Sequence, residues 1–303
     1  MPRFDYKNAF RTALNALPNG GTTDLQTLFS TPSLPAVTVA TKRKHLRDLI
    51  EAEPALLDRV VGFYPKVGTV IDLVETRHGP VTETRLDQAN DQCRQIVERI
   101  ALPVVHGFVQ SSLAAYIHGA DVAVPLADLM RFLLDDFADF NRGAGNGLVS
   151  IAGGMNEALL MRAMTRGGLR ENVHFKKTGT DSDGDFIVHS TGGNRDNLGV
   201  EVKSYHARER LLRGLQDITG PKVGAGFFKE PSEFNAQRTR TLRGTGAAAI
   251  YMPRATLTRV DAAALAAQTT DVRIADQCRL YRPLEQFVSD MGHFNRTGEL
   301  PRY

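Results

Sequence analysis

Residues 183–204 read DGDFIVHSTGGNRDNLGVEVKS, and the fold predicted for the second half of the chain is built around this stretch. Two runs rich in β-branched and aromatic residues flank the turn-forming segment TGGNRDN, a pattern that predicts two strands joined in a hairpin. Glu201 and Lys203 fall inside the second run, where burial of charge is unfavourable unless the charges are paired, hydrogen-bonded or bound to a metal. The two charges therefore require partners inside the protein or a bound metal ion.

The register of the hairpin groups the polar side chains on one face. If the hairpin is symmetric about Gly193, Asp185 lies directly across from Glu201, and directly opposed residues share a face of the sheet. Side chains alternate along a strand, so Lys203 emerges on the same face as Glu201. The opposite face then receives the apolar residues Phe186, Val188, Val200 and Val202.

Two opposed carboxylates raise one another's pKa unless a positive charge lies between them. Mg²⁺ is a suitable cation, because it prefers hard oxygen ligands and takes one or two carboxylates together with water and substrate phosphate. Asp185 and Glu201 are the predicted ligands, and the backbone carbonyl of Val202 can add a third oxygen. Lys203 would lie beside the metal, where an ammonium stabilises phosphate charge or orients an attacking water. Alternatively, Glu201 and Lys203 only form ion pairs on a half-exposed sheet face.

A third acid, Glu157, precedes the hairpin on a predicted helix at MNEALLMRAM. Leu160, Met161 and Met164 follow it at helical spacing, which places Glu157 on an inward-facing apolar stripe. It can support the metal site or the lysine. The alternative is a glutamate that only favours the helix dipole in the first turn, by about 0.3 to 1 kcal/mol.

A helix with an acid, an aspartate on one strand, E-x-K on the next strand and a following amphipathic helix together resemble the core of the PD-(D/E)xK nuclease superfamily, and in particular type II restriction endonucleases. In this resemblance Asp185 matches the first acid, Glu201 the second acid, Lys203 the lysine and Glu157 the helix acid. The resemblance covers residues 155–253.

The sequence around the first acid departs from the motif at one position and offers more than one acid. Gly184 occupies the position that is proline in the motif's name, and Asp181 and Asp183 lie close by in the sequence. The first acid is therefore left open between Asp183 and Asp185, with Asp185 preferred by the register.

The resemblance implies a Mg²⁺-dependent hydrolase that cuts double-stranded DNA at a specific sequence and leaves 5'-phosphate and 3'-hydroxyl ends. It implies a restriction system and a homodimer, since two copies would address the two strands of a symmetric site. The implied α/β fold is a mixed central sheet flanked by helices. Two alternatives stay open: a nuclease of the same superfamily in DNA repair or recombination, and a DNA-binding protein without catalysis.

Hydrophobic periodicity predicts a mostly helical region at 1–145 and alternating helices and strands at 146–303, where the resemblance implies the catalytic core. The Gly-rich run 141–154 is the expected boundary, and the N-terminal region is a candidate for DNA contact or dimerisation. Within it, residues 67–87 are expected to form a strand pair that turns at Gly79-Pro80.

A basic segment at 222–243 is the predicted DNA-contacting surface. Arginine suits phosphate contacts and bidentate reading of guanine, while asparagine and glutamine have the geometry to read adenine. A solvated basic helix face would show the same composition. The predicted contacts are Lys222, Lys229, Asn235, Gln237, Arg238, Arg240 and Arg243.

The composition of the 303 residues is that of a globular protein, with 42% hydrophobic and 23% charged residues, which argues against a disordered chain. A net charge of +3 is compatible with a polyanionic partner but does not require one. Cys93 and Cys278 are isolated, which argues against a zinc site or a disulfide framework. No apolar run is long enough for a membrane helix, and a cytoplasmic protein with no membrane partner is expected.

Overall fold

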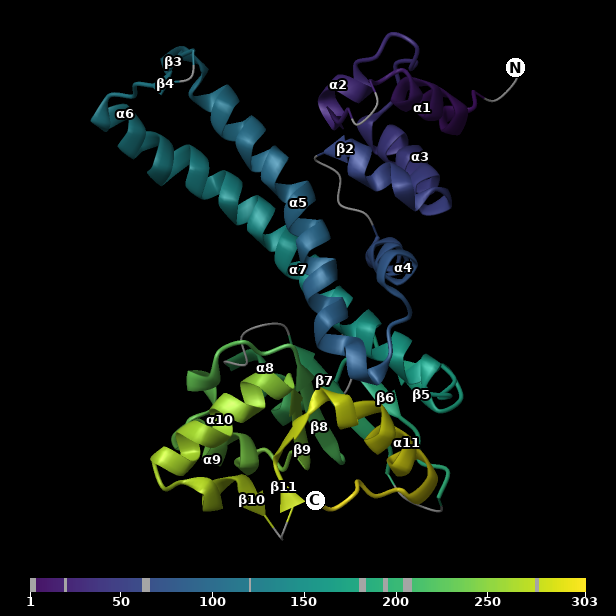
Figure 1. Ribbon diagram of the computed structural model, residues 1–303, viewed down its shortest axis with the longest axis vertical. Coiled ribbons are helices and arrows are strands. Elements are labelled where there is room, and N and C mark those ends of the chain that lie inside the picture. Colours follow the sequence, from purple (N-terminus) through teal and green to yellow (C-terminus); the bar gives the residue numbers. More distant parts are fainter. Residues whose placement is uncertain are drawn as a thin grey trace. The chain divides into compact units, whose positions relative to one another are not determined.

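The computed structural model describes residues 4–18, 21–61, 66–119, 121–179, 184–192, 196–203, 209–275 and 278–303 (Figure 1). Contacts between Cα atoms divide the chain into two units, which are described separately. The first comprises Met1–His78 and Gln92–Ile151, and the second comprises Gly79–Asp91 and Ala152–Tyr303.

The first unit is mostly helical. Its amphipathic helices bury Phe10, Leu14, Leu46 and Leu49 completely, which gives the N-terminal part an apolar core. Short strand pairs join β1 (Thr23–Asp24) to β2 (Val60–Val61) and β3 (Ile117–His118) to β4 (Asp121–Val122). The helices are α1 (Tyr6–Asn15), α2 (Leu25–Phe29), α3 (Val39–Ala52), α4 (Val67–His78), α6 (Leu126–Arg131), and the parts of α5 (Leu86–Ser112) and α7 (Phe137–Arg166) that fall in this unit.

The strand pair expected at 67–87 is wrong, because Val67–His78 forms helix α4 and Glu83–Arg85 forms the 3-10 helix η2. The β-branched residues of this segment favour strands, but burial of one helical face overrides that preference. Gly79 has φ +90°, so it ends the helix in a left-handed conformation instead of forming a hairpin turn.

The Gly-rich run 141–154, expected as the boundary between the two regions, lies inside α7. The division between the two units falls within this run, at Ile151.

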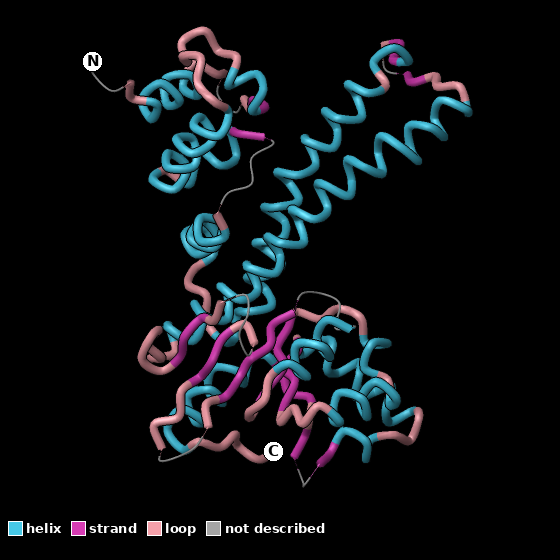
Figure 2. The backbone as a smooth tube through the Cα atoms, turned by 180° about the vertical axis from the view of Figure 1, so that it is seen from behind, coloured by secondary structure: helices cyan, strands magenta, loops and turns pink. Residues whose placement is uncertain are grey.

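Within the described residues, the second unit contains a six-stranded mixed sheet in the order β12-β9-β8-β7-β6-β5 (Figure 2). Strands β5, β6 and β7 pair antiparallel, whereas β7, β8, β9 and β12 run parallel. The mixed sheet flanked by helices confirms the predicted fold class. The strands are β5 (Phe175–Lys177), β6 (Phe186–Val188), β7 (Leu198–Lys203), β8 (Lys222–Gly226), β9 (Ala249–Met252) and β12 (Tyr281–Pro283).

Both faces of this sheet are covered by helices. On one face, α8 (Glu209–Asp217), α9 (Ala236–Gly244) and α10 (Arg254–Ala266) contribute Leu211, Leu242 and Val260 to a core cluster with Ile250. On the other face lies α11 (Phe287–Thr297), whose Phe287 packs edge-to-face on Phe186 and Tyr251. Because β7 runs through the middle of this arrangement, a charge on it is enclosed by protein.

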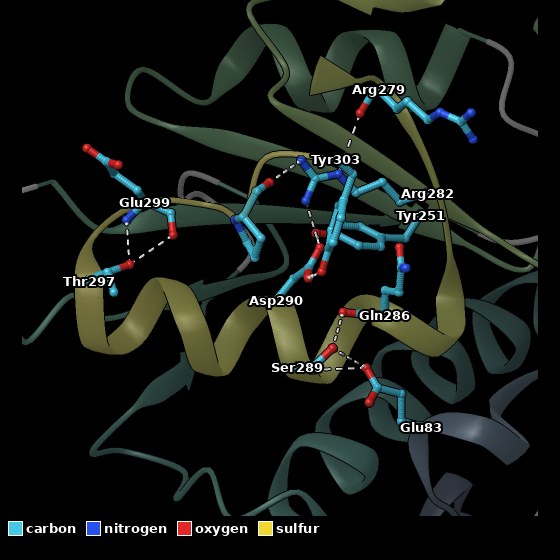
Figure 3. A network of polar contacts seen from close by, with 11 residues as sticks. Glu83, Tyr251, Arg279, Arg282, Gln286, Ser289, Asp290, Thr297, Glu299 and Tyr303 are labelled. Carbon is cyan, nitrogen blue, oxygen red and sulfur yellow. Dashed lines mark hydrogen bonds and ion pairs between the residues drawn. The ribbon is translucent and has the colours of Figure 1, made fainter. Parts of the chain in front are cut away.

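A buried polar network ties the C-terminal residues to the sheet (Figure 3). The carboxylate of Asp290 is fully buried and accepts from Arg282 and the Tyr251 hydroxyl at 2.7 Å, and from the Tyr303 hydroxyl at 2.8 Å. Arg282 also donates to the carbonyl of Pro301 at 2.8 Å. The network satisfies a charge that would be costly to bury alone.

None of the helices in the described part of the chain combines the length and the apolar character that crossing a membrane requires.

Candidate active site

The hairpin has the predicted register. Phe186 pairs with Val200 and Val188 pairs with Leu198, as expected for a hairpin symmetric about Gly193. Asp185 lies one residue before β6, and its N–H donates to the carbonyl of Val200 at 2.9 Å. Asp185 is therefore held by the backbone of β7, at the end of the strand that carries Glu201.

Three oxygen acceptors converge on the ammonium of Lys203. Its Nζ lies 3.3 Å from Oδ2 of Asp185 and 3.0 Å from the carbonyl oxygen of Val202, and it forms a close ion pair with Oε1 of Glu201. Oδ2 of Asp185 also accepts from the N–H of Val202 at 2.6 Å. The structure thus brings together the three groups that the sequence predicts as metal ligands, around one positive charge.

Burial sets the electrostatics of this cluster. The Glu201 side chain is 7% exposed, and burial raises its pKa, an effect that the hydrogen bond from Lys203 opposes. Burial acts to lower the pKa of Lys203, but the hydrogen bond with Glu201 and the charges of Asp185 and Glu201 outweigh it and raise that pKa overall. Pairing of the lysine with the carboxylates offsets the cost of burying each charge in the sheet.

Two glycines permit close packing around the acids. Gly214 in α8 faces Glu201, where an added Cβ would come within 2.0 Å of Oε1. Gly184 has φ +92°, and a Cβ there would lie 2.9 Å from the carbonyl oxygen of Val200. Proline is fixed near φ −65°, so this chain cannot carry the motif's proline at position 184 in this conformation.

The acids line one cavity of about 430 Å³ in the second unit. Glu157, Asp185 and Glu201 all border it, so the structure brings the helix acid to the two strand acids as expected. Lys177 and Asp217 border the cavity as well, and the sequence analysis missed both. Only the position of Lys177 at the end of a strand before the hairpin, and of Asp217 at the end of the following helix, could have indicated them.

The structure gives the position of only one candidate for the first acid. Asp181 and Asp183 lie outside the described residues, so Asp185 is the candidate whose position is known. Within the described part of the chain, no group of three or more histidine, cysteine, aspartate and glutamate side chains is arranged to hold a metal ion. Any metal site here would use two carboxylates and a backbone carbonyl, as the sequence predicts.

The predicted DNA-contacting arginines lie on and next to α9. Asn235 caps this helix, since its side-chain oxygen accepts from the N–H of Arg238 at 2.9 Å. Arg243 donates to the carbonyl of Val272 at 2.9 Å. Gln237 and Arg240 are exposed, which leaves them on the solvent side of the helix.

The two predicted lysines of the basic segment have partners elsewhere in the second unit. Lys222 donates to the carbonyls of Leu215 and Ile218 at the end of α8. Lys229 lies 3.0 Å from Asp87 and 3.2 Å from Asp91. The structure therefore does not gather these lysines with the arginines of α9.

A larger cavity of about 580 Å³ lies elsewhere in the second unit, where Arg243, Arg282, Arg302 and Glu299 are among its lining residues. It contains none of the predicted catalytic residues. We place the candidate active site at the smaller cavity, because the acids converge there.

Comparisons with known proteins give one remote similarity. No protein-family model matches the chain, and no curated protein sequence matches it. Among solved structures, the chain is similar to one described as a restriction endonuclease PspGI-substrate DNA complex, with 13% sequence identity and a TM-score of 0.49. The match covers 77% of this chain and 93% of that chain. A similarity at this level carries no argument about residues or activity, so the function is argued from the site.

Proposed function

We propose that this chain is a Mg²⁺-dependent endonuclease of the type II restriction class, which hydrolyses double-stranded DNA at a specific sequence to 5'-phosphate and 3'-hydroxyl ends. The observation that carries the proposal is the convergence of Asp185, Glu201 and the Val202 carbonyl on one positive charge beside an acid-lined cavity. Three hard oxygen donors around a cationic centre are what a Mg²⁺ site requires from a protein.

The donor set fits magnesium for two reasons. The three oxygens already surround a compact positive charge, because each of them accepts from or pairs with the Lys203 ammonium. Their arrangement therefore suits a cation. Mg²⁺ keeps several waters and substrate oxygens as ligands, so three protein oxygens suffice. A bound Mg²⁺ would supply an activated water at neutral pH and neutralise charge on the scissile phosphate.

The protein residues have separate roles in this proposal. Asp185 and Glu201 hold the metal, and Glu201 is fixed because α8 closes over it and leaves it 7% exposed. Lys203 moves from its carboxylate partners to the water or to a phosphate oxygen. There its positive charge stabilises the negative charge that develops in the transition state. Glu157 supports the site from α7 across the same cavity.

DNA contact and dimerisation complete the proposal. Gln237 and Arg240 on α9 are exposed proposed contacts, and Arg238 and Arg243 are partly exposed, whereas Asn235 first supports the helix as its cap. Two copies of the chain would present two active sites to the two strands of a symmetric sequence. A sedimentation mass near that of one chain at micromolar concentration, with and without DNA, would contradict the homodimer.

The decisive experiment is digestion of a mixed DNA substrate with Mg²⁺, followed by sequencing of the ends. We expect a defined cut site, no cleavage with EDTA, and a loss of at least about 100-fold in Asp185→Asn, Glu201→Gln and Lys203→Ala. Lys176→Ala is a matched control, since Lys176 is an exposed lysine that does not border the cavity. If Lys203→Ala cleaves as well as the wild-type chain, the assignment is wrong.

A DNA-binding protein without catalysis is the second candidate, and the ion pairs of Lys203 with both acids favour it. In such a protein the charges would only stabilise one another. Binding of duplex DNA without cleavage of any substrate, at any divalent-cation concentration, would support this candidate over the nuclease.

A further inference from the structure

Lys177 is the one cation among the described residues that line the 430 Å³ cavity, and Lys203 is not part of that lining. Lys177 is the last residue of β5, at the edge of the sheet, and pairs with Phe186. The sequence motif places its lysine at position 203. The structure places a second lysine, half exposed to solvent, on the lining of the acid-rich cavity.

The ammonium of Lys177 is held but not enclosed. Its Nζ lies 2.9 Å from Oε2 of Glu157, and its side chain is 51% exposed, against 18% for Glu157. A lysine ammonium has three N–H donors, so one carboxylate partner leaves capacity for an added acceptor. Because the lysine side of the pair is half exposed, solvent screens the interaction and the ammonium can exchange its partner.

The acids that border the cavity would repel an anionic phosphate, and Lys177 can offset this repulsion. Four carboxylates border the cavity, from Glu157, Asp185, Glu201 and Asp217. A phosphodiester is anionic, and two like charges repel by about 4 kcal/mol at 4 Å near a protein surface. A phosphate that enters the cavity therefore needs a nearby cation to offset the repulsion from the acids, and Lys177 is the cation among the described lining residues.

We propose that Lys177 is a substrate-binding residue that contacts a backbone phosphate of the DNA, and that Glu157 holds its side chain in position before DNA arrives. This inference rests on the proposed nuclease function. It predicts that the phosphate contact belongs to Lys177 itself and survives removal of the charge on Glu157.

The test is the binding of a fluorescein-labelled duplex that contains the cleavage site, or a mixed-sequence duplex if no site is found, without divalent cations. Anisotropy is measured over a range of salt concentrations. Each phosphate contact contributes about 0.9 to the slope of log affinity against log salt, so Lys177→Met should lower that slope by about 0.9 and weaken binding about tenfold at low salt.

Matched variants separate the phosphate contact from other effects. Lys177→Arg should retain the slope, because it keeps the charge. Lys176→Met should leave the slope unchanged, since the neighbouring side chain points to the opposite side of the strand. Glu157→Gln alone should tighten binding, because it removes a carboxylate that repels the phosphate, while the amide oxygen of glutamine can still accept from Lys177 and hold it in position. Urea unfolding of every variant checks that the fold is retained.

The double variant Lys177→Met with Glu157→Gln decides between two explanations. If Lys177 only neutralises Glu157, the neutral glutamine removes the need for it, and the double variant should bind with the wild-type slope. That rescue, or an unchanged slope in Lys177→Met, would overturn the inference. Our proposal expects the slope of the double variant to stay about 0.9 below that of Glu157→Gln.

Cleavage assays on the same proteins separate this inference from the proposed function. Cleavage by the wild-type chain with no slope change in Lys177→Met leaves the nuclease standing and overturns the role of Lys177. Binding that depends on Lys177, without cleavage by the wild-type chain, does the reverse. A wild-type chain that does not bind DNA overturns both.

Discussion

A Cβ atom at position 214 would lie 2.0 Å from Oε1 and 2.1 Å from Cδ of Glu201, so the absence of a side chain on α8 is what admits this carboxylate to the sheet. Glycine inside a helix costs about 1 kcal/mol relative to alanine. The chain tolerates that cost at Gly214 because any larger residue would displace a predicted metal ligand.

Gly214→Ala is therefore expected to destabilise the protein, although alanine is the better helix former. The clash with Glu201 should lower the free energy of unfolding by about 1 to 3 kcal/mol, measured by urea denaturation, and reduce any cleavage strongly. Gly153→Ala is the control, since Gly153 lies in α7 with no atom within 4 Å of an added Cβ, and it should be neutral or stabilising. Equal stability of the two variants would contradict the close packing of Gly214 on Glu201.

Gly184→Pro would restore the motif's Pro-Asp sequence and yet is expected to reduce activity. Proline cannot adopt φ +92°, so the substitution should shift Asp185 and cost about 3 kcal/mol in urea denaturation. Gly168→Ala isolates the effect of backbone conformation, because Gly168 has φ +90° with nothing near its Cβ position, and it should cost only about 1 kcal/mol. An active, stable Gly184→Pro variant would show that the backbone of the first acid differs from the one described.

Lys203→Met should leave the buried Glu201 and its neighbour Asp185 without their cation. Loss of one partner of a buried ion pair costs about 3 to 5 kcal/mol, which urea denaturation measures. Adding Glu201→Gln should recover part of the loss. If Mg²⁺ binds these oxygens, it should stabilise Lys203→Met more than the wild-type chain, and no Mg²⁺ effect on either protein would count against the metal site.

Glu83 is expected to make the stability depend on pH. Burial raises the pKa of its carboxyl above the ordinary 4.5, and the N–H donors of Ser289 and Val288 offset only part of the shift. Figure 3 shows the contact with Ser289. The folded protein therefore binds a proton more tightly than the unfolded chain, so this group's contribution to stability falls as pH rises through 4.5 and up to the raised pKa. Glu83→Gln should remove that decline, which denaturation curves at several pH values between 4 and 7 can test. A steeper decline in the variant would contradict the assignment.

Arg282→Met should be among the most destabilising substitutions in the second unit. It leaves the fully buried Asp290 without the guanidinium 2.7 Å away, at a cost of about 3 to 5 kcal/mol. Arg279→Met provides a control with an exposed side chain in the same segment and should change stability by no more than about 0.5 kcal/mol. Similar unfolding midpoints for the two variants would show that the network in Figure 3 does not support the fold.

The hairpin could be predicted from the sequence because its information is local. Two apolar runs on either side of one turn segment fix the register, and alternation then fixes which side chains share a face. Phe186 and Val200 pair as this reasoning predicts. The helix acid Glu157 could be placed for a similar reason, since its apolar neighbours recur at helical spacing.

Residues 67–78 show where local reasoning fails. Their valines and isoleucine favour a strand, yet they form α4, because burial of one helical face in the tertiary structure outweighs that preference. Lys222 and Lys229 show the same limit for charge. Their composition indicates a DNA surface, but their partners are helix carbonyls and the aspartates Asp87 and Asp91, which no local pattern reveals.

The hairpin register and the shared face of Asp185, Glu201 and Lys203 could be predicted from alternation along two neighbouring strands, and the α/β fold class from the alternation of helices and strands along the second half of the chain. The tertiary structure alone decided that Lys177 and Asp217 border the same cavity and that Gly214 makes room for Glu201. The physical reason is that strand pairing is written in neighbouring residues, whereas a cavity is bounded by side chains from separate elements whose contact depends on the packing of the whole unit.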